Sequence, residues 1–212
     1  MEPIYAVLSR SLAISGAATL LASAWSIPLA YYLSRTPRVN PLVYAMEALI
    51  GVPTVLVGLL LYLLLSREGP LGFLNLLYTP QAIMVGEALL ITPLVTALTY
   101  RSLRQVGASL RELALTLGAS EARATLLVLR ESAPSIVSSV VMGFSRAIGE
   151  LGVALVVGGN IMGYTRTLTT SIALATSMGE YELALELGAI LTLLTIGVSL
   201  VLRLVNRGWR LE

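Results

Sequence analysis

The sequence predicts an all-α, polytopic membrane protein with about five transmembrane helices. Three observations carry this prediction. Hydrophobic residues make up 56% of the chain and charged residues only 12%, whereas soluble domains carry about 25% charged residues. The mean hydropathy is +0.84, and five apolar stretches are each long enough to cross a bilayer. Because no linker or internal repeat divides the sequence, residues 1–212 are expected to form a single transmembrane domain.

Each predicted span holds roughly 20 to 25 residues, the length that a helix needs to cross the hydrocarbon core. The first is too long for the apolar region of a signal peptide, so we expect it to be retained. A further stretch, Thr167 to Met178, is shorter and rich in Thr and Ser, which favours a re-entrant or surface helix. The five spans are expected at Leu12 to Leu33, Val43 to Leu65, Gln81 to Tyr100, Pro134 to Val157 and Leu183 to Leu204.

The arginines predict the orientation, because basic residues gather on the cytoplasmic side of membrane proteins. They follow the first span, fill the segment after the third and close the chain, whereas only Arg67 and Arg166 fall on the opposite side. We therefore expect a multi-pass protein of the cell membrane with its N-terminus outside and its C-terminus inside. The inner arginines are Arg35, Arg38, Arg101, Arg104, Arg111, Arg123, Arg130, Arg203, Arg207 and Arg210.

The missing residue types exclude whole classes of chemistry. The chain has no Cys, His, Lys or Asp: all its basic residues are Arg and all its acidic residues are Glu. A P-loop needs Lys, a Ser-His-Asp triad needs His, and thiolate or imidazole metal sites need Cys or His. The formal net charge of +2 gives no footprint for nucleic acid. We expect no catalytic site, metal site or cofactor in this chain.

The segment of residues 101–132 is far more polar than the spans and too long for a simple connection. Ser109 and Glu112 have the spacing of a capping box, which predicts a helix beginning at Leu110. Leu110, Leu113 and Leu117 then form an apolar stripe at helical spacing. This segment is expected to fold as a helix rather than to remain a loop.

Gly118 is expected to end that helix in the left-handed conformation that suits glycine. Ser120 offers the next N-cap, and Glu121 suits the positive end of a second helix running toward Pro134. Residues 108–122 are therefore predicted to form an elbow of two short helices. On spacing alone, a hairpin lying on the lipid headgroups is an alternative.

Charged residues inside the predicted spans are candidates for functional sites. Arg146 and Glu150 are four residues apart and are expected to pair on one face of a helix. Their pair either fixes helix packing or meets the transported molecule, and spacing leaves both open. The small residues Ser135, Ser139, Gly143 and Ala147 recur along the same helix, which favours close approach of another helix.

Prolines and further carboxylates complete the candidate pore or gate residues. Pro53 is expected to interrupt the second span and Pro93 the third, freeing backbone carbonyls. Glu47 and Glu87 lie in these two spans without a partner at helical spacing. The glycines before Asn160 predict a turn at the outer side. The candidates are Pro53, Thr54, Glu87, Arg146, Glu150 and Asn160.

Several motifs resemble ABC-importer permeases of the oxyanion branch. The run Glu112 to Ser120, Glu-Leu-Ala-Leu-Thr-Leu-Gly-Ala-Ser, is similar to the family's EAA loop, with Leu113 in place of its first Ala. The segments Gly51 to Leu60, Ser66 to Gly72 and Phe144 to Gly152 resemble tungstate-uptake permeases most, and molybdate and sulfate permeases in part. Residues 158–161 and 165–170, which follow the last of these segments, resemble the same permeases.

This resemblance implies the type I ABC-importer permease fold and a transport subunit without catalytic activity. It implies a homodimer in the lipid bilayer, two ABC ATPase subunits that bind ATP and Mg, and an extracytoplasmic oxyanion-binding protein. In the family the EAA loop contacts the ATPase, which assigns that role here to Ser109, Leu110, Arg111, Glu112, Leu113, Ala114, Leu117, Gly118, Ala119 and Ser120. The implied cargo is tungstate or a related oxyanion such as molybdate.

Two other classes of function are alternatives on the residues alone. A proton-driven secondary transporter could use Glu47, Glu87 or Glu150, but it has no obvious use for a capped cytoplasmic elbow, and no inverted repeat is visible. An intramembrane hydrolase is disfavoured because no His, Cys or Asp is present to activate a Ser.

Overall fold

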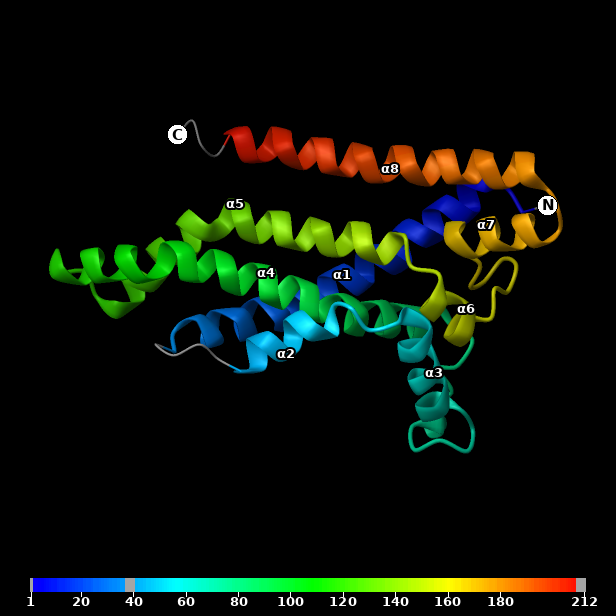
Figure 1. The fold of residues 1–212 in the computed structure, drawn as a ribbon, viewed down its shortest axis with the longest axis horizontal. Coiled ribbons are helices and arrows are strands. Elements are labelled where there is room, and N and C mark those ends of the chain that lie inside the picture. Colours follow the sequence, from blue (N-terminus) through cyan, green and yellow to red (C-terminus); the bar gives the residue numbers. More distant parts are fainter. Residues whose placement is uncertain (1, 37–40, 209–212) are drawn as a thin grey trace.

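The computed structural model describes residues 2–36 and 41–208, and the described chain is a bundle of α-helices with one short 3-10 turn (Figure 1). Short loops connect the elements. In order they are α1 (Ile4–Ser34), α2 (Pro41–Leu49), α3 (Thr54–Leu65), η1 (Gly72–Leu74), α4 (Pro80–Thr116), α5 (Glu121–Ile148), α6 (Gly152–Gly158), α7 (Leu168–Ser177) and α8 (Tyr181–Gly208).

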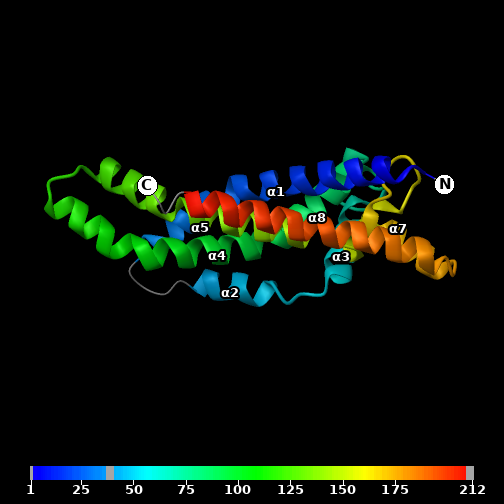
Figure 2. The same ribbon diagram turned by 90° about the horizontal axis from the view of Figure 1, so that it is seen from above.

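The expected number of membrane spans is confirmed. Within the described residues, α1, α4, α5 and α8 are each long and apolar enough to cross a bilayer, and the bent pair α2 and α3 makes up to five spans. Figures 1 and 2 show the four long helices along the long axis of the molecule. Helix α4 is the most buried of them and packs against both α1 and α5. It is therefore the central element of the bundle.

The second span, expected from Val43 to Leu65 with an interruption at Pro53, is broken there into two helices. Helices α2 and α3 meet at a bend of 100°, so that α3 leaves the bundle direction (Figure 1). Pro53 has no backbone N–H with which to continue the helix, which is why an interruption was expected at this residue. Helix α3 packs instead on α6, where a Cβ on Gly58 would lie 3.2 Å from Val153 Cα. This contact fixes the direction of α3.

The expected helix start at Leu110 is wrong, because α4 runs without a break from Pro80 to Thr116. Its actual N-cap is Thr79, whose Oγ1 accepts a hydrogen bond from Ala82 N at 3.3 Å. Ser109 lies inside this helix, because residues with high helix propensity on both sides of it continue the helical hydrogen bonds. No backbone amide is left free there for a capping side chain to bind. Pro93 lies inside α4 and does not end it; a kink at this proline stays a prediction.

The elbow is confirmed at Gly118, although its arms are the ends of two long helices rather than two short ones. Helix α4 ends at Thr116, and Gly118 adopts a φ of +85°. Ser120 is the N-cap of α5, its Oγ accepting from Arg123 N at 3.4 Å. Helix α5 then continues through Pro134 to Ile148. The polar segment therefore extends the bundle and does not form a separate unit.

The fourth span was expected to run unbroken to Val157, but α5 ends at Ile148 and α6 begins at Gly152. Glu150 lies in the break, and its Oε1 accepts a hydrogen bond from Val153 N at 3.2 Å. A carboxylate that satisfies a free amide in this way starts a new helix. The small-residue contact is confirmed at Gly143, where a Cβ would lie 2.7 Å from Val95 Cγ2 of α4.

The two ends of the bundle differ in the elements that they carry. The elbow lies at the same end as the last turns of α1 and α8, and the N-terminus lies with α7 at the other end (Figure 1). Helix α7 is too short for a span, as expected, and Thr167 and Thr170 cap its start. Arg38 and Arg210 lie outside the described residues. Which end faces the cytoplasm stays a prediction.

Candidate functional site

The elbow is held together by an ion pair across its two arms. Arg111 of α4 donates two hydrogen bonds to Glu121 of α5, at 2.6 and 2.7 Å to the two carboxylate oxygens. Arg35, at the end of α1, approaches the same carboxylate at 4.0 Å. Ala114 is buried, and its carbonyl accepts from Ala119 N at 2.9 Å. The tip of the elbow is therefore a defined turn with α1 beside it.

The outer surface of the elbow is apolar. The side chains of Leu113 and Leu117 are 56% and 79% exposed, and only Leu110, further from the tip, packs against a buried cluster. Glu112 and Ser109 are exposed as well, and Glu112 forms no ion pair with any residue that the structure describes. The predicted stripe thus exists, but its last turn is left uncovered.

The predicted pair of Arg146 and Glu150 is confirmed as a contact, with Arg146 Nη1 donating to Glu150 Oε2 at 2.7 Å. The partners differ in exposure: the Glu150 side chain is 2% exposed and that of Arg146 is 42% exposed. Thr169 of α7 also donates to the Glu150 carbonyl at 2.8 Å. Glu150 therefore joins α5, α6 and α7, while the guanidinium reaches the surface of this chain.

Two other predicted residues lie near this break. Glu87 of α4 is 2% exposed, meets the Ser15 hydroxyl of α1, and has no hydrogen-bond partner for Oε2 among the described residues. Its neighbour Gly86 packs so closely on α6 that a Cβ would lie 2.4 Å from Val153 Cγ1. Thr54, which follows Pro53, sits against Gly152. We call Thr54, Glu87, Arg146 and Glu150 the junction.

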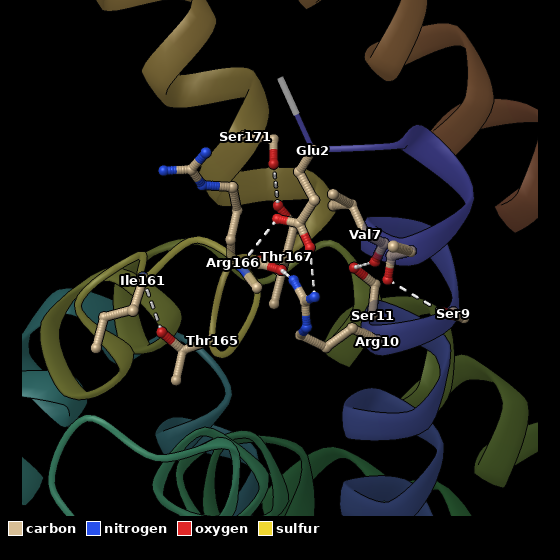
Figure 3. Close-up of polar contacts among 12 residues, drawn as sticks. Glu2, Val7, Ser9, Arg10, Ser11, Ile161, Thr165, Arg166, Thr167 and Ser171 are labelled. Atoms are coloured by element: carbon tan, nitrogen blue, oxygen red, sulfur yellow. Dashed lines mark hydrogen bonds and ion pairs between the residues drawn. The ribbon is translucent and has the colours of Figure 1, made fainter.

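Asn160 does not belong to the junction; it lies at the end of the bundle that carries the N-terminus. Its φ is +51°, and its Oδ1 accepts from Arg166 Nε at 3.1 Å. Figure 3 shows how this loop is tied to the start of α1: Arg10 donates to the Arg166 carbonyl at 2.8 Å and pairs with Glu2. The Glu2 carboxylate also accepts from Gly163 N at 3.2 Å.

The hydrogen bond from Arg10 lowers the pKa of Glu2 below its ordinary value, against a smaller opposing effect of burial. Because the folded-state pKa is lowered, this contact stabilises the fold above the ordinary Glu pKa, and the stabilisation is lost as pH falls through the folded value. We expect Glu2→Gln to reduce the free energy of unfolding by about 1 to 2 kcal/mol at pH 7 and by much less at pH 3.

Thermal unfolding of both proteins at the two pH values in detergent checks this expectation. Glu68→Gln is the control, because Glu68 is exposed and should show no such difference. An equal effect of Glu2→Gln at pH 7 and pH 3 would rule out the ionised carboxylate as the source of the stability.

Sequence reasoning missed contacts between residues far apart in the chain. Arg101 donates to Glu47 at 3.0 and 2.8 Å from Nε and Nη2, a partner 54 positions away that helical spacing could not show. Gly152 and Thr169 were also missed. A Cβ on Gly152 would lie 2.9 Å from Val55 N, and a close approach of this kind has no signal in the spacing of one helix.

Comparison with known proteins agrees with this architecture. Residues 19–211 match the family described as binding-protein-dependent transport system inner membrane component. The chain is 40% identical over 203 residues to the tungstate uptake system permease protein TupB of Peptoclostridium acidaminophilum, covering 94% of this chain and 88% of that protein. It is 34% identical over 203 residues to a probable anion ABC transporter permease protein of Haloferax volcanii, covering 92% and 88%.

The fold matches that of a solved importer. The MetNI methionine ABC transporter in inward-facing conformations has a chain that superimposes with a TM-score of 0.75, covering 99% of both chains at 14% identity. This likeness shows the fold of an ABC-importer permease, as expected. Family membership decides against the proton-driven carrier and the hydrolase. The chain belongs to the binding-protein-dependent transport family, as a non-catalytic, multi-pass permease subunit of the inner membrane that works with ATPase and binding-protein partners.

Proposed function

We propose that this permease carries tungstate, or a related oxyanion such as molybdate, into the cell as a homodimer driven by two ATPase subunits that bind ATP and Mg. The 40% identity to a tungstate uptake permease over 94% of the chain supports the cargo. The tungstate uptake system permease protein TupB of Campylobacter jejuni is 34% identical over 74% of this chain and supports the same cargo. An extracytoplasmic binding protein delivers the anion.

The exposure of the Arg146 side chain is the observation that supports a homodimer with the translocation path between its two copies. Arg146 lies near the end of a predicted span, and its side chain is 42% exposed on this chain. An arginine facing lipid costs about 3 kcal/mol at the centre of a span and less near its ends, where the side chain can reach the headgroups. A second copy placed against this face removes the charge from lipid and gives a permeating anion a positively charged group to pass.

The exposed tip of the elbow supports the ATPase contact. Leu113 and Leu117 are largely exposed at the end of the bundle where α1 and α8 also finish (Figure 2). An apolar tip beside the Glu112 carboxylate, which pairs with none of the described residues, suits a partner with a groove of matching chemistry. We propose that residues 108–122 dock there. With this end in the cytoplasm, the turn around Asn160 faces the binding protein outside.

Reconstitution tests this function. The permease is expressed with the ATPase and binding protein encoded beside it, placed in liposomes, and assayed for uptake of tungstate, molybdate and sulfate with and without ATP. We expect ATP-dependent uptake that needs the binding protein and is fastest for tungstate or molybdate. Uptake without ATP, or transport of sulfate alone, contradicts the proposal. Titration of the binding protein with the three anions measures selectivity separately.

A further inference from the structure

A cavity of about 310 Å³ lies at the elbow end of the bundle, between the end of α1, the last turns of α4 and the first turns of α5. It is separate from the junction and shares only Arg111 and Glu112 with the proposed ATPase-contact residues. Leu103 and Val128 form its apolar part, and both are buried. Apart from Gly107, the other side chains of its lining are polar or charged.

Three guanidinium groups line this cavity, from Arg35 of α1 and from Arg104 and Arg111 of α4. They are neutralised unequally. Arg111 pairs with Glu121 through Nη2, while its Nε is buried and forms no hydrogen bond within residues 2–36 and 41–208. Arg35 is 4.0 Å from the same carboxylate. Glu121 is thus shared by two arginines, and the cavity also includes the Glu112 carboxylate.

Arg104 is the arginine left without a carboxylate. Its Nη1 donates to the Thr36 carbonyl at 2.9 Å, and within residues 2–36 and 41–208 it makes no ion pair. A guanidinium has five N–H donors, so one bond to a neutral carbonyl leaves most of them free. Arginine recognises carboxylate and phosphate oxygens through paired N–H groups. The unused donors therefore define a place for an anion.

The helix surface between Arg104 and Arg111 leaves room for such an anion. Gly107 lies between them, and a Cβ there would meet Val128 Cγ1 at 3.3 Å, so a side chain would narrow the cavity. Hydroxyl groups complete the lining: Tyr31 and Thr125 share a hydrogen bond of 3.0 Å between their oxygens. Hydroxyl groups and guanidinium groups together suit an ion that accepts several hydrogen bonds from different directions.

We propose that this cavity binds a tetrahedral oxyanion of the phosphate type, held by Arg104 and Arg35. The anion is either a dissolved ion or the phosphate of an anionic phospholipid, because arginines at the cytoplasmic ends of spans lie near the headgroups. In either case it joins α1 to α4 where the elbow begins. The site does not depend on which anion the permease carries.

Binding of inorganic phosphate to the full-length permease in nanodiscs tests the site. One set of nanodiscs contains phosphatidylcholine alone and a second contains phosphatidylglycerol as well. Calorimetric titration with phosphate is run at constant ionic strength with chloride as the balancing ion, and native mass spectrometry detects retained phosphatidylglycerol. Arg104→Gln is compared with Arg101→Gln, which removes an arginine one turn away that pairs with Glu47 and does not line the cavity.

We expect saturable phosphate binding in phosphatidylcholine discs, weakened about tenfold or more by Arg104→Gln, since a charge-assisted hydrogen bond is lost, and changed less than twofold by Arg101→Gln. If phosphatidylglycerol abolishes phosphate binding and is itself retained through Arg104, the occupant is a lipid. If it does not compete, the occupant is a dissolved ion. If Arg104→Gln misfolds, phosphate binding is measured with Arg35→Gln instead, since the Arg35 side chain is half-exposed. The proposal fails if neither probe binds, or if both helix α4 variants weaken binding equally.

Discussion

We expect Gly118→Val to abolish transport while leaving the permease folded in the membrane. Gly118 has a φ of +85°, and apart from its chain neighbours no described residue has an atom within 4 Å of a Cβ built there. The added side chain therefore meets no neighbour, and the cost is backbone strain of about 1 to 2 kcal/mol for a β-branched residue in the left-handed region. Relief of that strain changes the angle between α4 and α5 and so displaces the surface that we propose docks with the ATPase. Oxyanion uptake and copurification of the ATPase are the measurements.

Two matched variants separate backbone strain from the position of the turn. Gly118→Asn should retain most uptake, because Asn tolerates the left-handed conformation. Gly179→Val introduces a similar strain between α7 and α8, where φ is +77° and the space is again open, and should still copurify with the ATPase. Normal uptake by Gly118→Val would show that the elbow geometry does not matter for coupling.

Reversal of the exposed carboxylate next to the tip tests the same surface without touching the backbone. Glu112→Arg should also lose transport and ATPase copurification, since Glu112 is exposed and breaks no ion pair described in this chain. Glu68→Arg, on an exposed carboxylate of the loop between α3 and η1, is the control for adding a charge. Normal uptake by Glu112→Arg would show that the ATPase does not recognise this carboxylate.

Removing one partner of the Arg146–Glu150 pair should destabilise the protein strongly. Glu150 is 2% exposed, pairs with Arg146 at 2.7 Å and accepts from Val153 N. We expect Glu150→Ala to lower the free energy of unfolding by about 3 kcal/mol, because it removes a buried charge-assisted bond and the start of α6 at once. Thermal unfolding in detergent and the amount of protein in the membrane measure this loss.

The double variant Arg146→Gln with Glu150→Gln separates packing from transport. Its neutral side chains can still hydrogen-bond, so we expect most of the stability to return relative to either single change. Uptake should stay low, because we propose that the exposed guanidinium meets the anion. Recovery of both stability and uptake would mean that the pair only fixes helix packing. The exposed pair Arg101 and Glu47 is the control, and its neutral double should change stability by about 1 kcal/mol or less.

The turn of the elbow could be predicted because its signals are local. Gly118 supplies a backbone conformation and Ser120 a cap, each within a few residues of the feature that it fixes. The capping pattern at Ser109 was also local, but it failed because helix-forming residues on both sides made an uninterrupted helix more favourable than a new start. Local patterns therefore identified the turn and misplaced the beginning of the helix before it.

The junction was predicted only in part, because its geometry depends on contacts between distant segments. The pairing of Arg146 with Glu150 follows from four-residue spacing, but the break at Glu150 does not. The 100° bend beside Pro53 depends on how α3 packs on α6 at Gly58, nearly 100 positions before its contacts at Val153 and Val156. A proline predicts that a helix changes direction, but packing sets the new direction.

The unbroken course of α4 has a mechanical consequence. Its 37 residues give a length of about 55 Å at 1.5 Å per residue, and the helix carries Glu87 near one end and Leu113 near the other. Since no loop interrupts α4, a tilt of about 5° about one end would move the other end by about 5 Å over that length. A force applied at the elbow would therefore be transmitted along α4 to the segment around Glu87. The size of the movement there would depend on where α4 packs against α1 and α5.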